Sequence, residues 1–105
     1  MVTLNPKCID DTTTEDLIEE AERRSPGARA RIEARVAELA LARRVRALRE
    51  KRGLTQTELA ERAGTGQAAI ARIESGKAVP KLDLLARIAT ALGAKLDVRL
   101  TPVRS

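Results

Sequence analysis

Two short helices can be read from the sequence between Leu54 and Gly76, because residues that start and stop helices stand at both ends of each. Thr55 and Glu58 have the spacing of a capping box, in which each side chain accepts a hydrogen bond from the other residue's backbone N–H. Gly64 can adopt the positive φ that ends the first helix, and Gly76 can end the second in the same way. A turn of roughly three or four residues joins them, so this stretch predicts a compact helical pair.

The second helix, which Thr65 or Gly66 opens, is predicted to have two different faces. At about 100° per residue, Ile70 and Ile73 fall on an apolar side that can pack against the rest of the protein. The other side carries Gln67, Ala68, Ala71 and Arg72. Glutamine can make a bidentate pair with adenine, arginine can do so with guanine, and alanine offers a methyl group to thymine. The composition of this face favours a helix that reads bases in a DNA groove.

With its flanks, from about residue 39 to residue 93, this segment resembles the Cro/CI-type helix-turn-helix domain of the Xre family. The match extends over half of the chain without an insertion, and the residues that carry it are Arg49, Gly53, Leu54, Thr55, Gln56, Leu59, Ala60, Gln67, Ile70, Ile73, Glu74 and Gly76. The resemblance implies that Gln56 bonds a DNA phosphate and that Arg49 forms a structural ion pair with a buried Glu74. It also implies that Gln67, Ala68 and Arg72 face bases.

Two departures from the family pattern narrow the expected base contacts. Ala68 and Ala71 stand where polar readers are frequent, and Gly66 stands at a common hydroxyl position. Base reading is therefore expected to depend on Gln67 and Arg72.

Phosphate contacts are expected on either side of the base-reading helix. They should come from Gln56, from the segment around Gly76 and Lys77, and from Lys81 where the next helix begins. The full predicted DNA-binding set is Gln56, Thr65, Gly66, Gln67, Ala68, Ala71, Arg72, Lys77 and Lys81.

The residue types that the chain lacks exclude several kinds of function. There is no Phe, Tyr or Trp among the 105 residues, so we do not expect a binder of single strands that stacks bases on aromatic rings. The absence of His, with Cys8 as the single cysteine, removes the usual zinc sites and the catalytic arrangements that depend on histidine. We therefore expect no enzyme activity, no cofactor and no metal, and duplex DNA is the compatible ligand.

Length, cysteine use and hydropathy set the expected context. At 105 residues the chain is long enough for one domain with appendages. Cys8 cannot form an intramolecular disulfide, which fits a reducing compartment. The sequence has no apolar run of membrane-spanning length, and its N-terminus is acidic where a signal peptide would be basic. We expect a cytoplasmic protein with no membrane contact.

Charge is distributed unevenly along the chain. Residues 1–38 carry nine acidic and six basic side chains, whereas residues 39–105 carry six acidic and fourteen basic ones. The basic part contains the predicted helical pair, and a positively charged domain gains affinity for duplex DNA by releasing counterions. Charge and motif therefore point to the same ligand.

The fold class is expected to be all-α: a five-helix Cro/CI-type domain with an N-terminal helical extension and one C-terminal β-strand. A short acidic helix is expected over residues 12–24. A long helix should run from Pro26 to the stop at Gly53, and it could contain a bend or break near residues 37–40. Pro80 predicts the start of the last helix of the domain.

Apolar and polar residues alternate over residues 94–101, which predicts a strand. Because no second strand is predicted in the chain, its open edge should pair antiparallel with the same strand of a second copy. The predicted dimer contacts are Leu96, Val98 and Leu100. The resulting homodimer would read the two halves of a palindromic operator. A frayed tail is the alternative for this segment.

The acidic N-terminal part, residues 1–38, is expected to be separate from the DNA-binding domain at residues 39–93 and the dimerisation strand at residues 94–101. Its helix has a thin apolar stripe flanked by acidic residues, formed by Leu17, Ile18 and Ala21. This layout resembles HigA-type antitoxins, which implies an antitoxin that binds a ribonuclease-type toxin through the stripe and represses its own operon. The alternatives are a stand-alone Xre-type regulator and a protein-interaction adaptor on the same fold.

Overall fold

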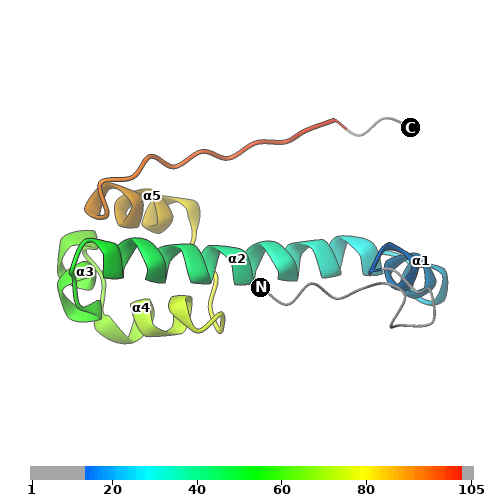
Figure 1. Cartoon of the computed structure of the whole chain (residues 1–105), viewed down its shortest axis with the longest axis horizontal. Coiled ribbons are helices and arrows are strands. Elements are labelled where there is room, and N and C mark those ends of the chain that lie inside the picture. The colour runs from blue at the N-terminus through cyan, green and yellow to red at the C-terminus, as the bar shows by residue number, and fades with distance from the viewer. Residues whose placement is uncertain (1–13, 103–105) are drawn as a thin grey trace. The chain divides into compact units, whose positions relative to one another are not determined.

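The computed structural model describes residues 14–102, and this stretch contains five helices and no strand. The helices are α1 (Thr14–Arg24), α2 (Ala28–Lys51), α3 (Gln56–Ala63), α4 (Gln67–Glu74) and α5 (Leu82–Ala91), as Figure 1 shows. The predicted all-α class and the number of helices are confirmed. The chain divides into two compact units, residues 1–37 and residues 38–105, and the division falls inside α2. Among the described residues, no helix is long and apolar enough to span a membrane.

The turn from α1 to α2 is held by one carboxylate in the first unit. Glu22 accepts hydrogen bonds from the backbone N–H groups of Gly27, at 3.0 Å, and Arg29, at 2.8 Å. The N–H of Arg29, which has the larger effect, and the N–H of Gly27 hold the pKa of the Glu22 carboxyl below its ordinary value. Gly27 has a φ of +92°, a conformation that no α-helical residue adopts. For this reason α2 begins at Ala28, and the predicted start at Pro26 was wrong.

The first helix of the predicted pair, α3, starts and ends as its sequence indicates. The Thr55 hydroxyl accepts from the Glu58 N–H, and the Glu58 carboxylate accepts from the Thr55 N–H, each at 3.0 Å. At the other end Gly64 has a φ of +70°. Arg87, from α5, donates to the carbonyls of Ala63 and Gly64 at 3.1 and 3.3 Å. A cation therefore covers the carbonyl end of α3, where the helix dipole is negative.

The second helix of the pair, α4, is bounded by two glycines. Gly66 caps its start without a side-chain hydrogen bond, and Gly76 lies after its end with a φ of +76°. Ile70 and Ile73 are buried, whereas Gln67 on the other face is exposed. The two faces predicted from the helical period are therefore present in the structure.

One apolar core lies in the second unit and receives side chains from all four of its helical segments. It consists of Val45, Leu59, Ala60, Ala63, Ile70, Ile73, Ile88 and Leu92. Leu59, Ile70 and Ile88 are the largest side chains that are fully buried. Burying each of them is worth about 1.5–3 kcal/mol relative to exposure. This core fixes α4 so that its polar face is turned to solvent.

Three further expectations differ from the structure. The helical hydrogen bonding of α2 continues through residues 37–40, so the expected break is absent. The last helix begins at Leu82 with Lys81 as its N-cap, and Pro80 lies before it. Residues 94–101 form neither helix nor strand in the described chain, because a strand needs a hydrogen-bonded neighbour and residues 14–102 offer none. Thr12 and Cys8 lie outside the described residues.

Candidate nucleic-acid interface

The polar face of α4 presents short and long side chains side by side. Gln67, Ala68 and Arg72 are exposed, and Ala71 is half-buried. The Arg72 guanidinium forms no ion pair with a described residue. The salt bridges of residues 14–102 are made by other arginines. An exposed arginine next to small side chains can approach another surface closely and still donate several hydrogen bonds.

Behind this face lies a bidentate ion pair between α2 and the end of α4. The Arg49 Nε atom is 2.6 Å from Glu74 Oε2, and Arg49 Nη2 is 2.9 Å from Glu74 Oε1. Arg49 Nη1 also donates to the carbonyl of Leu54 at 2.8 Å. Only 13% of the Arg49 side chain and 4% of the Glu74 side chain are exposed. Hydrogen bonding to Glu74 raises the pKa of Arg49 above its ordinary value, so Arg49 stays charged.

Two further hydrogen bonds connect this ion pair to the exposed face of α4. Gln56 Nε2, at the start of α3, donates to Glu74 Oε1 at 3.2 Å. Gln67 Nε2, at the start of α4, donates to Gln56 Oε1 at 2.7 Å. Arg49, Glu74, Gln56 and Gln67 thus form one hydrogen-bonded chain, which runs from a part-buried cation to an exposed amide. We call these four residues the polar chain.

All four members of the polar chain are predicted from the sequence as site residues, but two of the hydrogen bonds that join them are not. Gln56 and Glu74 are 18 positions apart, and Gln67 and Gln56 are 11 apart. No local pattern connects residues at such separations, because their contact depends on how α3 packs against α4. The Arg49 and Glu74 pair had been inferred from the family resemblance, and the structure brings these two side chains together.

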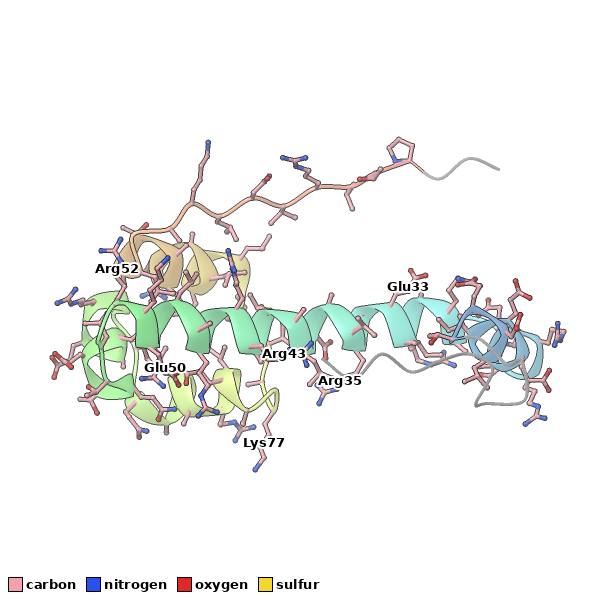
Figure 2. The ribbon with its side chains drawn as sticks, in the orientation of Figure 1. Glu33, Arg35, Arg43, Glu50, Arg52 and Lys77 are labelled. Atoms are coloured by element: carbon pink, nitrogen blue, oxygen red, sulfur yellow. The ribbon has the colours of Figure 1, made fainter. Side chains whose placement is uncertain are left out.

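The remaining predicted DNA contacts flank α4 in sequence. The Thr65 N–H donates to the Ala60 carbonyl at 2.9 Å and Thr65 is half-buried, so this residue closes the turn before α4. Lys77 follows α4, with its backbone N–H bonded to the Arg72 carbonyl at 2.9 Å and its side chain extending away from the helices (Figure 2). Lys81, at the start of α5, is exposed. Both lysines are available to anions.

A small hollow of about 220 Å³ adjoins the polar chain and is lined in part by two residues that are not among the predicted site residues. They are Arg46 and Ser75. Arg46 Nε donates to Glu50 at 2.8 Å, and Ser75 Oγ donates to the Arg72 carbonyl at 3.0 Å. The helical spacing of Arg46 and Arg49, one turn apart on α2, was the available signal for the first of them.

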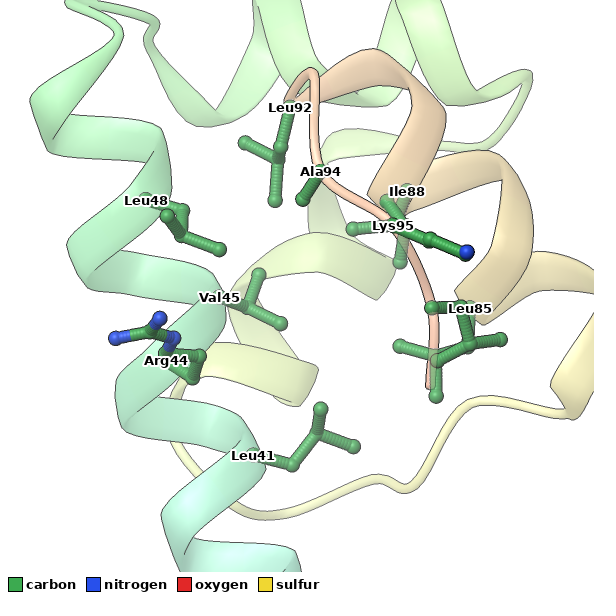
Figure 3. Close-up of a pocket in the computed structure, with 11 residues that line it drawn as sticks. Leu41, Arg44, Val45, Leu48, Leu85, Ile88, Leu92, Ala94 and Lys95 are labelled. Atoms are coloured by element: carbon green, nitrogen blue, oxygen red, sulfur yellow. The ribbon is translucent and has the colours of Figure 1, made fainter. Parts of the chain in front are cut away.

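An apolar groove lies on another side of the same unit, between α2, α5 and the segment that follows α5. Figure 3 shows leucines of α2 facing α5 across it. It has a volume of about 310 Å³ and is lined by Leu41, Arg44, Val45, Leu48, Leu85, Ile88, Ala89, Leu92, Ala94, Lys95 and Leu96. Of the predicted dimer contacts, Leu96 therefore lines the groove, whereas Val98 and Leu100 are exposed.

The predicted partner-binding stripe lies on α1, in the first unit. Leu17 is 57% exposed, and Ile18 and Ala21 are half-buried. Leu17 is thus the most exposed large apolar side chain of the stripe. Residues 14–102 contain no cluster of three potential metal ligands among His, Cys, Asp and Glu.

Comparison with known proteins agrees with this geometry. Residues 45–98 match the family model described as helix-turn-helix. An uncharacterized HTH-type transcriptional regulator of Methanothermobacter thermautotrophicus is 49% identical to this chain over 49 residues, which are 47% of this chain and 71% of that protein. The chain therefore belongs to the helix-turn-helix family, in agreement with the Xre-type pattern of its sequence.

Proposed function

We propose that this chain is a sequence-specific DNA-binding transcriptional regulator that represses by covering an operator. The observation that carries the proposal is the polar chain, which holds the exposed amide of Gln67 at the start of α4. The transcriptional role named for the relative from Methanothermobacter thermautotrophicus supports the same reading. The excess of basic side chains in residues 39–105 supplies the long-range attraction to DNA.

The polar chain suggests which base Gln67 reads. An ionised carboxylate can only accept hydrogen bonds, so Gln56 turns its NH₂ group to Glu74 and its carbonyl oxygen to Gln67. Gln67 must then donate one of its two amide hydrogens to Gln56. One N–H donor and one carbonyl acceptor remain on Gln67. This pair is complementary to N7 and N6 of adenine in the major groove.

Arg72 supplies the second base contact in this proposal. It lies five positions after Gln67 on α4, it is exposed, and a guanidinium pairs in a bidentate manner with O6 and N7 of guanine. Ala68 and Ala71, between the two readers, allow a close approach to the groove. The preferred half-site therefore contains an adenine and a guanine on the strands that α4 faces.

Phosphate contacts would orient the domain on the duplex. Gln56 retains a second Nε2 hydrogen that neither Glu74 nor Gln67 uses, and it lies at the start of α3 where the helix dipole favours an anion. Lys77 and Lys81 follow α4 and are exposed. These contacts give affinity that falls with salt but does not depend on sequence.

We further propose that the operator is palindromic and that a homodimer binds it. A single domain of this kind contacts few bases, whereas a two-fold dimer reads two half-sites about 34 Å apart. The alternating segment at residues 94–101 would join the copies by strand pairing, with Leu96, Val98 and Leu100 on the shared apolar face.

The surface of α1, in the first unit, supports the proposal that the chain also binds a protein partner. The exposed Leu17 lies on α1 in a sequence rich in carboxylates, namely Glu15, Asp16, Glu19, Glu20 and Glu22. Within the first unit Glu15 pairs with Arg29 and Glu20 pairs with Arg23 and Arg24, so the surface keeps an acidic excess but is not purely acidic. Such a surface is complementary to a basic protein with a small apolar hollow. An antitoxin that neutralises a ribonuclease-type toxin through α1, and autoregulates their operon, is the corresponding function.

Selection of sites from randomised duplex DNA tests the DNA-binding proposal. The wild-type chain should select a two-fold symmetric sequence, and Gln67→Ala should lose preference at one base pair of each half-site. Selection of no sequence by the wild type would contradict the proposal and favour an interaction adaptor. For the antitoxin role, a chain lacking residues 1–24 should lose its toxin while it keeps its operator. If the wild-type chain captures no toxin from its own operon, the stand-alone regulator is correct.

A further inference from the structure

The segment after α5 has an apolar face that is longer than the groove between α2 and α5 on which it begins. Ala94 and Leu96 are half-buried at the groove between α2 and α5. Val98 and Leu100 follow at the same spacing of two, but they are 65% and 97% exposed. In an extended chain, all four side chains point to the same side. Within residues 14–102, therefore, no side chain covers the exposed half of this apolar face.

The opposite face of the segment carries charges that restrict how two copies can pair. Lys95, Asp97 and Arg99 alternate with the apolar residues, and Asp97 accepts from Arg99 at 3.1 Å within one chain. In an antiparallel two-fold pair, residues at equal distances on either side of the symmetry axis stand opposite each other. An axis that passes between two residues would place apolar side chains opposite charged ones, so the axis must pass through a residue.

We propose that the copies pair with Val98 on the two-fold axis. This register, which rests on the proposed dimer, places Asp97 of each copy opposite Arg99 of the other, and Leu96 opposite Leu100. Registers centred on Asp97 or Arg99 would oppose like charges, which is unfavourable.

A register centred on Leu100 would pair Val98 with Pro102, which has no N–H to donate to a partner strand. A register centred on Leu96 also avoids like charges, but it leaves more of the apolar face uncovered. It would pair Lys95 with Asp97, but Arg99 and Leu100 would extend beyond the end of the partner strand. The register centred on Val98 pairs all residues from 95 to 101. It also brings Leu100 of the second copy beside Leu96, which lines the groove. The occupant of the open groove is then Leu100 of a second copy, next to Leu41 and Leu85.

Disulfide trapping distinguishes the registers. In the full chain with Cys8→Ser, Val98→Cys should form a covalent dimer under mild oxidation, because residues on the axis lie within the 4.4–6.8 Å Cα separation of a disulfide. Leu100→Cys is the matched control. It is the more exposed position, but its two copies would be about 14 Å apart along the strands at 3.4 Å per residue, so it should stay uncrosslinked alone and crosslink only when mixed with Leu96→Cys.

A charge exchange gives a second readout that does not depend on cysteine. Asp97→Arg and Arg99→Asp chains should each fail to self-associate, and a mixture of the two should form a heterodimer, because opposite charges then face each other across the pair. Crosslinking of Leu96→Cys alone, or equal crosslinking at all three positions, would overturn the register. A monomeric Cys8→Ser chain in light scattering would overturn the dimer itself, and operator binding measured in parallel reports on the DNA-binding proposal separately.

Discussion

Replacing Glu74 with alanine should destabilise the second unit even in the absence of DNA. The substitution removes two hydrogen bonds of 2.6 and 2.9 Å from the Arg49 guanidinium and leaves that cation with the Leu54 carbonyl as its hydrogen-bond acceptor and with the exposed Glu50 carboxylate 4.0 Å away. Breaking a buried ion pair by removing one partner costs about 3–5 kcal/mol. Arg49 keeps one acceptor and is 13% exposed, so water can recover part of the loss and we expect about 3 kcal/mol.

The expected change in melting temperature is large enough to measure directly. For a domain of this size, 1 kcal/mol shifts Tm by about 4–8 °C, so Glu74→Ala should lower Tm by roughly 12–24 °C in circular dichroism melts. Glu61→Ala is the matched control. Glu61 is an exposed glutamate on α3, and its removal should change stability by less than about 0.5 kcal/mol.

A double substitution shows whether the loss comes from the Arg49 cation that has lost Glu74. In Arg49→Met with Glu74→Ala, no charge remains buried, so this chain should be more stable than Glu74→Ala alone. Urea unfolding of the four chains of this cycle gives the coupling free energy. A Glu74→Ala chain within about 1 kcal/mol of the wild type, or a double variant whose loss equals the sum of the single losses, would refute the role of the ion pair.

Further predictions concern DNA specificity, assembly, pH and the partner. Arg72→Ala should weaken binding to the preferred operator by about 1–3 kcal/mol and relax one base pair; equal weakening on every sequence in a competition assay would contradict its role as a base reader. Val98→Asp should convert the dimer to a monomer in light scattering, and a dimer that survives must use another surface. Hydrogen bonding from Thr55 lowers the pKa of Glu58, so the capping box stabilises the fold above the ordinary carboxyl range and this contribution is lost as pH falls through the lowered value. The Tm difference between wild type and Glu58→Gln should therefore shrink from pH 7 to pH 3, and a constant difference would exclude the linkage. Removal of residues 1–24 should abolish capture of a toxin while thermal stability of the second unit is kept; capture by the truncated chain would place the partner site elsewhere.

Local features of the sequence predicted the DNA-binding part of the fold well. The capping box of Thr55 and Glu58, the stop at Gly64 and the two faces of α4 all depend on residues within a few positions of each other. Such features are set by backbone stereochemistry and helical period, which a sequence displays directly.

Features that depend on contacts between distant residues could not be read in the same way. The hydrogen bonds of Gln56 to Glu74 and to Gln67 arise from the packing of α3 against α4. Helix α2 starts at Ala28 and not at the predicted Pro26, because Gly27 adopts a positive φ. The proline itself is compatible with a helix start. Residues 94–101 form no strand, although their apolar and polar residues alternate, because residues 14–102 contain no second extended segment that could pair with them.

The most direct test of the proposed DNA reading is the base preference of Gln67 at its contact position. Binding of the wild type and of Gln67→Ala should be measured on the selected operator and on duplexes that carry each of the other three base pairs there. The wild type should prefer adenine by about 1–3 kcal/mol, and Gln67→Ala should bind all four duplexes equally. A wild-type chain that binds the four duplexes with the same affinity, or a Gln67→Ala chain that keeps the adenine preference, would contradict the proposal.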